Sequence, residues 1–423
     1  MFVRKELLGD AKINITDEQP LDAVRLARAI ASAKDAADDD ESFMIVDLDA
    51  LYERLQLWKR EMPDVQPYYA VKCNSDECVL RVLAACGVNF DCASREEIDI
   101  VTRCGVAPER IIYANPCKTR SFIHHAQEMG VDLMTFDNKE ELVKILKYHA
   151  TPRLVLRIAV SDPTATCPLN LKFGAEPTKA APELLKAAAD LGVNVCGVSF
   201  HVGSGCNDPT AYHVALQHTK NLFELGEALG HHMEIVDMGG GFPGGAHHIS
   251  FEQIAALIRS STAELFGDDS GVKLIAEPGR FFAAHPFTLA TNIIAASEVP
   301  AEKITKQASP DSAATGFMYY LNDGVYGSFN CILFDHVHPQ GRPLFDAEGE
   351  ELYPTTLWGP TCDSLDQIEA NVAMRRLAVG DWMLHEDMGA YTCAASTTFN
   401  GFQRPKAIYV MGEALWRKMD MSI

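Results

Sequence analysis

Short apolar, β-prone runs alternate along the chain with segments whose apolar residues recur at helical spacing. Eight such runs occur between residues 67 and 277, at Pro67–Val71, Asn89–Cys92, Ile111–Ala114, Leu133–Phe136, Leu154–Ile158, Gly197–His201, Ile235–Met238 and Lys273–Glu277. Between them, segments such as Ser94–Cys104 and Lys139–His149 have the helical period. Eight strand and helix units predict an α/β fold with a closed parallel (β/α)8 barrel, which they fit better than a doubly wound open sheet.

Polar residues or glycines stand at or just after the C-terminal ends of these predicted strands. In chain order they are Lys72, Asp91, Asn115, Asp137, Arg157, His201, Gly239, Gly240, Gly241 and Glu277. Because the chemistry of such barrels lies at the face formed by the strand ends, we expect these residues on one rim. Some have a structural explanation as well, since Asp137 with Asn138 can start a helix and Asp91 can accept backbone hydrogen bonds.

Lys72 occupies a position where a lysine can be partly desolvated. Desolvation lowers the pKa of an amine, and the neutral amine can attack an aldehyde such as that of pyridoxal phosphate. A single lysine is far more often a solvated surface group, so this interpretation depends on partners. Glu277 could keep a pyridine nitrogen protonated and so make the ring an electron sink. His201 could cover the ring face, although a satisfied core histidine is the alternative.

The run Gly239–Gly245 contains a G-x-G-x-x-G match, which suggests a dinucleotide-binding loop. We reject that interpretation because the next helix begins near Ser250, where Ser250 and Gln253 form a capping-box pattern, and not directly after the glycines. Glycines after the seventh strand leave backbone N–H groups accessible to a phosphate, and Arg280 adds a charged fork. The loops after strands seven and eight often bind phosphate in barrels. A plain turn remains the alternative.

Composition narrows the class of protein. The chain has 423 residues, of which 47% are hydrophobic, enough for one large domain and a smaller one. A net charge of −21 disfavours nucleic acid or an anionic membrane as a partner. No signal-peptide core or membrane-length apolar run is present, so a cytoplasmic location is expected.

Twelve cysteines without CxxC pairs indicate reduced thiols, and we expect no metal. The pairs His231-His232 and His247-His248 are expected in solvated loops.

Four segments resemble those of a known enzyme family, namely Tyr69–Lys72, His201–Gly205, Glu277–Arg280 and Trp358–Asp363. They are similar to the barrel-type pyridoxal-phosphate decarboxylases of ornithine, lysine and arginine, and among these to the eukaryotic ornithine decarboxylases. The resemblance covers nearly the whole chain and includes Asn322–Phe329, Phe334–His336, Gly389–Thr392 and Phe399–Pro405. It implies a pyridoxal-phosphate-binding barrel over residues 47–285. It also implies a β-rich sandwich or sheet domain formed by residues 1–46 and 286–423.

The resemblance implies roles for particular residues. Lys72 would carry the cofactor, Glu277 would pair with the pyridinium nitrogen and His201 would stack on the ring. The rest of the cofactor site would comprise Asp91, Arg157, Ser204, Gly239, Gly240, Gly241, Pro278, Gly279, Arg280 and Tyr391, with Arg280, Gly241, Ser204 and Tyr391 at the phosphate. Cys362 would return a proton to the substrate α-carbon, and Asp335 and Asp363 would bind the distal ammonium. The substrate site would also include Tyr326, Phe334 and Phe399.

The same resemblance implies an activity and an assembly. The loop of Cys362 and Asp363 would enter the neighbouring subunit, so that a homodimer forms shared active sites. The expected reaction is decarboxylation of L-ornithine to putrescine, the entry step of polyamine synthesis. Two alternatives stay open, a catalytically silent regulator similar to antizyme inhibitor and a decarboxylase of lysine, arginine or diaminopimelate. Antizyme binding also stays open.

Two departures from the family pattern affect these expectations. Phe334 stands where many relatives have tyrosine, so any role of that hydroxyl is absent. The sequence ends soon after Trp416, and the long tail of the rapidly degraded animal enzymes is therefore not expected to control turnover.

Overall fold

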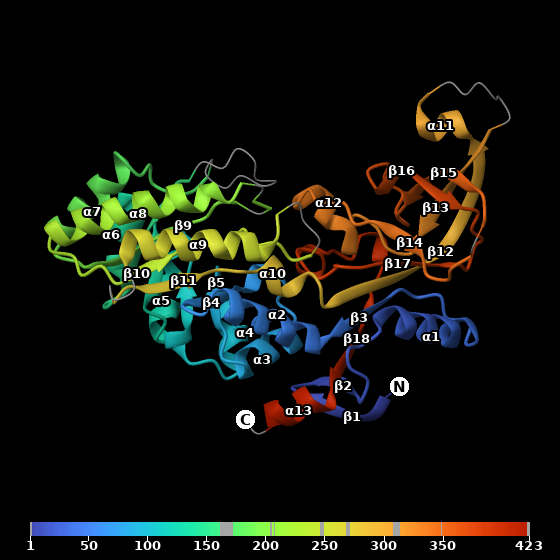
Figure 1. The fold of residues 1–423 in the computed structure, drawn as a ribbon, viewed down its shortest axis with the longest axis horizontal. Helices are drawn as coiled ribbons and strands as arrows, with labels where there is room; N and C mark the ends of the chain where they lie inside the picture. The colour runs from blue at the N-terminus through green and yellow to red at the C-terminus, as the bar shows by residue number, and fades with distance from the viewer. Residues whose placement is uncertain are drawn as a thin grey trace. The chain divides into compact units, whose positions relative to one another are not determined.

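The chain forms two compact units, shown in the ribbon of Figure 1. The computed structural model describes residues 2–160, 172–203, 205–206, 208–245, 249–267, 271–307, 314–347 and 349–420. The unit Leu51–Phe282 contains the parallel strands and is called the barrel unit. The unit formed by Met1–Ala50 and Ala283–Ser422 is called the sheet unit.

Eight parallel strands close the barrel. They are β4 Val65–Ala70, β5 Asn89–Cys92, β6 Ile111–Tyr113, β7 Leu133–Phe136, β8 Arg153–Ile158, β9 Val195–Phe200, β10 Ile235–Asp237 and β11 Lys273–Ala276. Pairing of β11 with β4 and of β10 with β9 completes the circle. The predicted (β/α)8 barrel is confirmed.

Helices alternate with these strands, as the spacing predicted (Figure 1). They are α2 Leu48–Glu61, α3 Glu77–Ala85, α4 Arg95–Arg103, α5 Arg120–Glu128, α6 Lys139–Tyr148, α7 Ala180–Asp190, α8 Thr210–Ala228, α9 Phe251–Phe266 and the short α10 Arg280–Ala283, with single turns η1 Val71–Cys73 and η2 Pro108–Arg110. Polar side chains set several of the starts. Ser250 caps α9, and Ser250 and Gln253 form the predicted capping box. The helix therefore begins well after the glycine run, as expected.

Apolar side chains from the strands fill the barrel. One buried cluster takes a residue from almost every strand, namely Tyr68, Ile112, Ala114, Leu133, Val155, Cys196, Ile235 and Ile275. A barrel of eight strands has an interior just wide enough for side chains to fill it. Polar residues that matter for chemistry are thereby placed at the strand ends.

The sheet unit has a mixed ten-stranded sheet. Its strands are β1 Phe2–Leu8, β2 Ala11–Thr16, β3 Phe43–Asp47, β12 Phe287–Pro300, β13 Thr315–Leu321, β14 Gly341–Pro343, β15 Leu352–Trp358, β16 Gln367–Arg375, β17 Trp382–His385 and β18 Lys406–Gly412. The order is β1-β2-β18-β3-β12-β13-β15-β16, and β17 pairs with β12 and β14. Because β18 lies between β2 and β3, the N-terminal segment belongs to this sheet, as predicted.

Helices and turns cover parts of the sheet unit. They are α1 Ala23–Asp35, α11 Ala301–Thr305, α12 Cys331–Phe334 and α13 Glu413–Asp420, with single turns η3 Ser328–Asn330, η4 Cys393–Ala395 and η5 Phe399–Gly401. The apolar face of α1 packs on Phe43 and Trp382 of the sheet. The indole N–H of Trp382 donates to Asp35 at 2.7 Å, which satisfies its polar atom.

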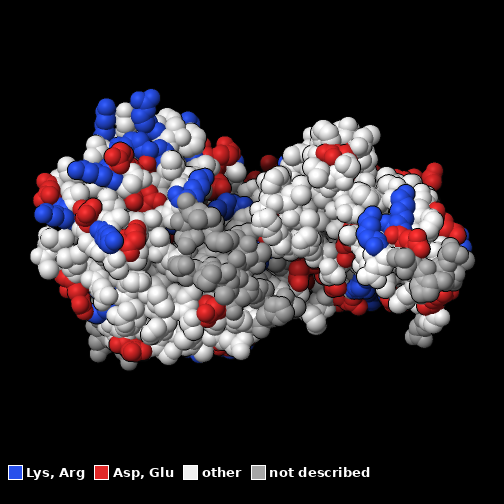
Figure 2. Space-filling model, turned by 90° about the horizontal axis from the view of Figure 1, so that it is seen from above, with Lys and Arg blue, Asp and Glu red and all other residues white. Residues whose placement is uncertain are grey.

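Charged side chains of both signs are interspersed over the described part of the face in Figure 2. None of the helices in the described ranges has the length and hydrophobicity that crossing a bilayer requires.

Candidate functional site

The lysine singled out by the sequence pairs with a buried acid. The strand β4 ends at Ala70, and the turn η1 carries Lys72 out of it. The Nζ atom forms an ion pair with Asp91 Oδ2, and Ala70 is the register partner of Asp91 across β4 and β5. The side chain of Asp91 is 0% exposed and that of Lys72 is 40% exposed. The ion pair holds the amine of Lys72 against a buried carboxylate at the end of the neighbouring strand.

Two buried carboxyl groups lie at the ends of neighbouring strands. Glu277 follows β11, and Asp237 closes β10; the two side chains share a hydrogen bond. Burial, and then the charges of Asp237 and Asp91, raise the pKa of Glu277 well above its usual range, while Lys72 acts in the opposite direction. Burial also raises the pKa of Asp237. Like charges this close do not both ionise, so the pair holds a proton at neutral pH.

Asp237 is a site residue that the sequence analysis missed. Its Oδ1 atom accepts from the N–H of Gly239 at 2.9 Å, so it also fixes the start of the glycine loop. A signal was present, because an acid interrupts the apolar run Ile235–Met238 immediately before the glycines. Charged residues are rarely fully buried unless they are paired.

His201 follows β9 and is neutral. Burial first, and then the positive charges of Arg157 and Lys72, lower its pKa well below the usual range. The Nδ1 atom accepts from the N–H of Gly203 at 3.1 Å, which places the remaining proton on Nε2. Arg157 lies in β8, with its guanidinium 5.4 Å from the ring of Phe173. A neutral, flat imidazole thus stands at this end of the barrel.

The glycines after β10 are needed for close packing. Gly239 and Gly241 have φ of +59° and +108°, in the region that favours glycine. A Cβ atom at Gly239 would lie 2.2 Å from the carbonyl oxygen of Phe200, and one at Gly240 would lie 2.7 Å from His201 Nε2. The loop therefore passes directly against the end of β9.

The segment after β11 lies against the turn of Lys72. The N–H of Ala70 donates to the carbonyl oxygen of Pro278 at 3.2 Å. A Cβ atom at Gly279 would lie 2.8 Å from Cys73 Cβ, so glycine is required for this approach. Arg280 follows and begins α10. Lys72 and Glu277 are therefore held at adjoining loops of the barrel.

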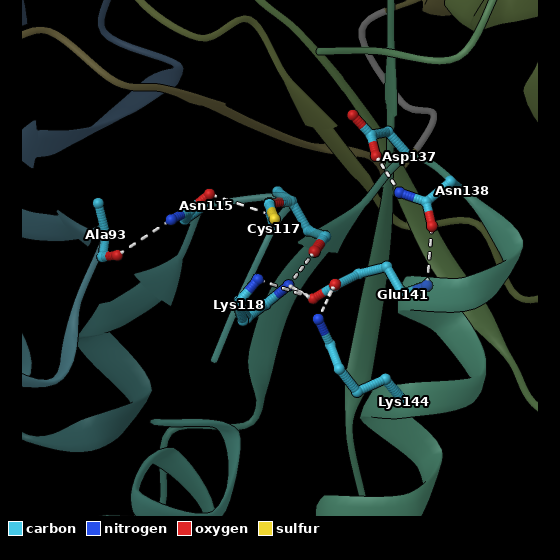
Figure 3. Close-up of polar contacts among 9 residues, drawn as sticks. Ala93, Asn115, Cys117, Lys118, Asp137, Asn138, Glu141 and Lys144 are labelled. Carbon is cyan, nitrogen blue, oxygen red and sulfur yellow. Dashed lines mark hydrogen bonds and ion pairs between the residues drawn. The ribbon is translucent and has the colours of Figure 1, made fainter. Parts of the chain in front are cut away.

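Asn115 and Asp137 have contacts that shape loops (Figure 3). The Asn115 side chain donates to the carbonyl oxygen of Ala93 at 3.3 Å and accepts from the N–H of Cys117 at 3.0 Å. Asp137 accepts from the side chain of Asn138 at 2.8 Å, and Asn138 caps α6. These contacts account for two of the polar residues expected on the rim.

A buried lysine in the same region was also missed (Figure 3). Lys118 Nζ donates to the carbonyl oxygen of Thr135 at 2.5 Å and to Glu141 Oε1 at 3.1 Å. The other oxygen of Glu141 pairs with Lys144 at 2.5 Å. Burial lowers the pKa of Lys118 to about 8. The sequence held no signal for this, because a lysine in a polar loop is normally exposed.

The sheet unit brings three of the expected substrate residues together. The hydroxyl of Tyr326 donates to Asp363 Oδ2, and its ring centroid lies 4.5 Å from that of Phe399. The N–H of Leu365 donates to Asp363 Oδ1 at 3.0 Å. That bond first, and then the one from Tyr326, lower the pKa of Asp363. Its carboxylate is therefore anionic at neutral pH.

The remaining predicted residues are placed as follows. Cys362 is exposed next to Asp363, and Phe334 is 69% exposed at the end of α12. Asp335 is buried, and its N–H donates to the carbonyl oxygen of Cys331 at 3.0 Å. Tyr391 has a left-handed backbone with φ of +55°. Ser204 and the pair His247-His248 lie outside the described residues.

The barrel residues fit pyridoxal phosphate chemically. Lys72 supplies an amine, and the acid pair holds a proton where a pyridine nitrogen would need one. His201 offers a flat neutral surface, and the glycine loop with Arg280 offers donors to a phosphate. One buried acceptor, Asp91 Oδ1, has no hydrogen-bond partner among the described residues. Such an atom is rarely left unsatisfied in a site that holds no ligand.

Comparison with known proteins agrees with this chemistry. The profile of the family described as "Pyridoxal-dependent decarboxylase, pyridoxal binding domain" matches residues 48–284. An ornithine decarboxylase of Caenorhabditis elegans is 60% identical over 419 residues, which cover 99% of this chain and 99% of that protein. Antizyme inhibitor 2 of Xenopus laevis is 45% identical over 418 residues, covering 98% of this chain and 90% of that protein.

A solved structure has the same fold. The arginine decarboxylase of Paramecium bursaria Chlorella virus superimposes with a TM-score of 0.83 at 36% identity. The match covers 92% of this chain and 100% of the viral one.

Proposed function

The chain belongs to the family of pyridoxal-dependent decarboxylases, and on that premise we propose that it decarboxylates L-ornithine to putrescine and carbon dioxide. The observation that carries the proposal is its full-length similarity to an ornithine decarboxylase, combined with an amine and a proton-holding acid pair at adjoining loops of one barrel. Pyridoxal phosphate is the cofactor. When bound, it supplies an electron sink for the electron pair left on the substrate α-carbon as carbon dioxide departs.

We propose that barrel residues hold this cofactor. Lys72 is the point of covalent attachment, and Asp91 orients its amine. Glu277, backed by Asp237, would pair with the pyridine nitrogen and keep it protonated, because the acid pair already holds a proton. The neutral ring of His201 covers one face. The phosphate is bound by Gly241, Arg280, Ser204 and Tyr391, as the family resemblance implies, whereas Gly239 and Gly240 shape the loop that carries Gly241.

The substrate side of the proposal rests on the sheet unit. Asp363 is anionic, because Leu365 and Tyr326 stabilise its carboxylate, so it can bind a distal ammonium group. We assign the same role to Asp335. Cys362 is exposed, and its thiol can donate a proton to the α-carbon.

We further propose that the active enzyme is a homodimer whose two sites each use Cys362 and Asp363 of the other subunit. Apolar side chains around that loop and on α12 support an interface, since Leu365 is 62% exposed and Phe334 69% exposed. A partner subunit that covered these side chains would remove their apolar surface from water. Two-fold pairing is the commonest way to cover such a surface.

The proposal is tested by carbon dioxide release from ornithine, lysine and arginine in parallel assays. We expect ornithine to react fastest, with discrimination against the longer lysine of roughly 10- to 200-fold for one methylene. We expect Lys72→Ala to lose both the visible absorbance of bound cofactor and the activity, and Lys59→Ala, an exposed lysine on α2, to keep them. Faster reaction of lysine or arginine would identify a related decarboxylase. A protein that binds no pyridoxal phosphate would instead be a regulator of the antizyme-inhibitor type.

A further inference from the structure

One arginine outside the predicted site bonds to both loops that we assign to the phosphate. Arg54 lies on α2, and its Nε atom donates to the carbonyl oxygen of Phe281 at 2.9 Å. Its Nη2 atom donates to the carbonyl oxygen of Pro243 at 3.2 Å. Pro243 lies within the glycine loop that follows β10, and Phe281 is the residue after Arg280. A single guanidinium therefore links the loops that follow the seventh and eighth barrel strands.

The guanidinium also lies over an aromatic ring, which restricts where it can point. Its carbon lies 3.9 Å from the ring centroid of Phe281, within the range of a cation–π contact. An arginine fork is planar and has five donors, so it can bond two carbonyl groups in different directions at once. A lysine has a compact charge on a flexible stem and does not reproduce this geometry.

An aromatic layer beneath the loops makes the same connection. Trp58 is one turn further along α2, and its ring centroid lies 4.9 Å from Phe242 and 5.3 Å from Phe281. Its indole N–H donates to the carbonyl oxygen of Val65 at 2.8 Å, so the ring is anchored. On the other side, the hydroxyl of Tyr212 donates to the carbonyl oxygen of Gly240 at 2.9 Å. The glycine loop and the Arg280 segment thus pack on the same aromatic side chain of α2.

We propose that Arg54 is a positioning residue for the phosphate group of the cofactor. By holding the carbonyl groups of Pro243 and Phe281 at a constant spacing, it keeps the glycine amides and Arg280 converged on one point before the phosphate binds. Preorganised groups bind more tightly because less ordering is needed on binding. This inference rests on the proposed function, because it deepens the account of the same site.

The inference predicts a selective loss. Without Arg54 the two loops keep their own amides and Arg280 but lose their common spacing, so affinity for the phosphate group falls. The bonds from Arg54 to Phe281 and Pro243 lie at the loops assigned to the phosphate, whereas Lys72 and Glu277 are assigned to the aldehyde and the pyridine nitrogen, so attachment of an aldehyde without a phosphate should depend on Arg54 much less. We expect Arg54→Gln to weaken pyridoxal phosphate binding about tenfold or more, and pyridoxal binding by less than about twofold.

The experiment titrates the full-length apoenzyme with pyridoxal phosphate and, separately, with pyridoxal, and follows cofactor absorbance. Inorganic phosphate is added as a competitor, and we expect it to compete less well in Arg54→Gln. Arg54→Lys should lie between wild type and Arg54→Gln. The matched control is Arg60→Gln on the same helix, which is exposed and pairs with Glu61, and which should bind both aldehydes as wild type does.

Three outcomes overturn the inference. They are unchanged pyridoxal phosphate affinity in Arg54→Gln, an equal loss for pyridoxal, and unchanged competition by inorganic phosphate. Thermal unfolding of each apoprotein shows whether the variant folds. If Arg54→Gln does not fold, the affinities of Arg54→Lys for pyridoxal phosphate and for pyridoxal are compared instead, and the same outcomes overturn the inference. Failure of the proposed function is distinguishable, because the wild-type protein itself would then bind no pyridoxal phosphate or would release carbon dioxide faster from lysine or arginine, and neither result depends on Arg54.

Discussion

At the scale of single residues, burial sets the protonation of the groups that matter. His201 and His385 are held neutral, and Glu277 is held protonated, because a low-dielectric interior disfavours the charged form. His385 is the clearest case. Its ring packs against Phe329 with centroids 4.8 Å apart, and neither ring nitrogen has a hydrogen-bond partner in the described part of the chain. Burial lowers its pKa to about 3.

His385 should therefore make the protein sensitive to acid. Its pKa is about 3 when folded and about 6.5 when unfolded, so between these values only the unfolded chain binds the proton. The free energy of unfolding then falls as pH decreases below 6.5, by about 1.4 kcal/mol for each pH unit, and this contribution is fully retained above that pH. We expect His385→Leu to flatten the decline between pH 7.5 and 5.5 in urea unfolding. His232→Leu, at an exposed position, is the control, and equal slopes for wild type and His385→Leu would contradict the prediction.

At the scale of elements, ion pairs and caps join loops to helices. Lys118, in the loop after β6, is 0% exposed and pairs with Glu141 of α6, which is 3% exposed. The backbone N–H of Lys118 also donates to Glu141 at 3.2 Å. Lys144 contacts the same carboxylate but is 26% exposed. The buried and the exposed partner of one acid can therefore be compared directly.

We expect Lys118→Met to lower the free energy of unfolding by about 3 kcal/mol, because removing one member of a buried pair leaves Glu141 poorly compensated. Lys144→Met should cost less than about 1 kcal/mol, since exposed pairs contribute little. Denaturant unfolding at pH 7 measures both. Similar losses in the two variants would mean that burial does not govern the strength of these contacts.

At the scale of the whole molecule, the residues to which we assign roles belong to different units of the chain. Lys72 and Glu277 belong to the barrel unit, whereas Cys362 and Asp363 belong to the sheet unit. If the subunits share sites as proposed, each monomer contributes one half of each of two sites. This arrangement makes activity a property of the assembly.

Mixing two inactive variants tests that arrangement. We expect Lys72→Ala and Cys362→Ala to be inactive separately and to recover about a quarter of wild-type activity after subunit exchange, because half of the dimers are mixed and each has one intact site. The control mixes the Lys72→Ala variant with a double variant that carries both Lys72→Ala and Cys362→Ala. Every subunit then lacks Lys72, so this mixture should show no activity. If no activity returns although exchange is demonstrated, the sites are not shared.

Much of the architecture follows from local sequence. The alternation of apolar runs and helical spacing predicted all eight barrel strands, and the Ser250 and Gln253 pattern predicted where α9 begins. These features are local, because a strand or a capped helix is encoded in consecutive residues. The position of Lys72, His201 and Glu277 at strand ends could be predicted for the same reason.

The sequence by itself thus determined which residues stand at the rim of the barrel, and the tertiary structure decided what each of them does there. Only the register of β4 against β5 brings Asp91 to Lys72, and only the adjacency of β10 and β11 places Asp237 beside Glu277. The bridging position of Arg54 depends on two loops that lie 189 and 227 residues further along the chain. Contacts between distant segments decide which side chains pair and how deeply each is buried. The protonation of these side chains depends on both, so it cannot be predicted from the local sequence pattern.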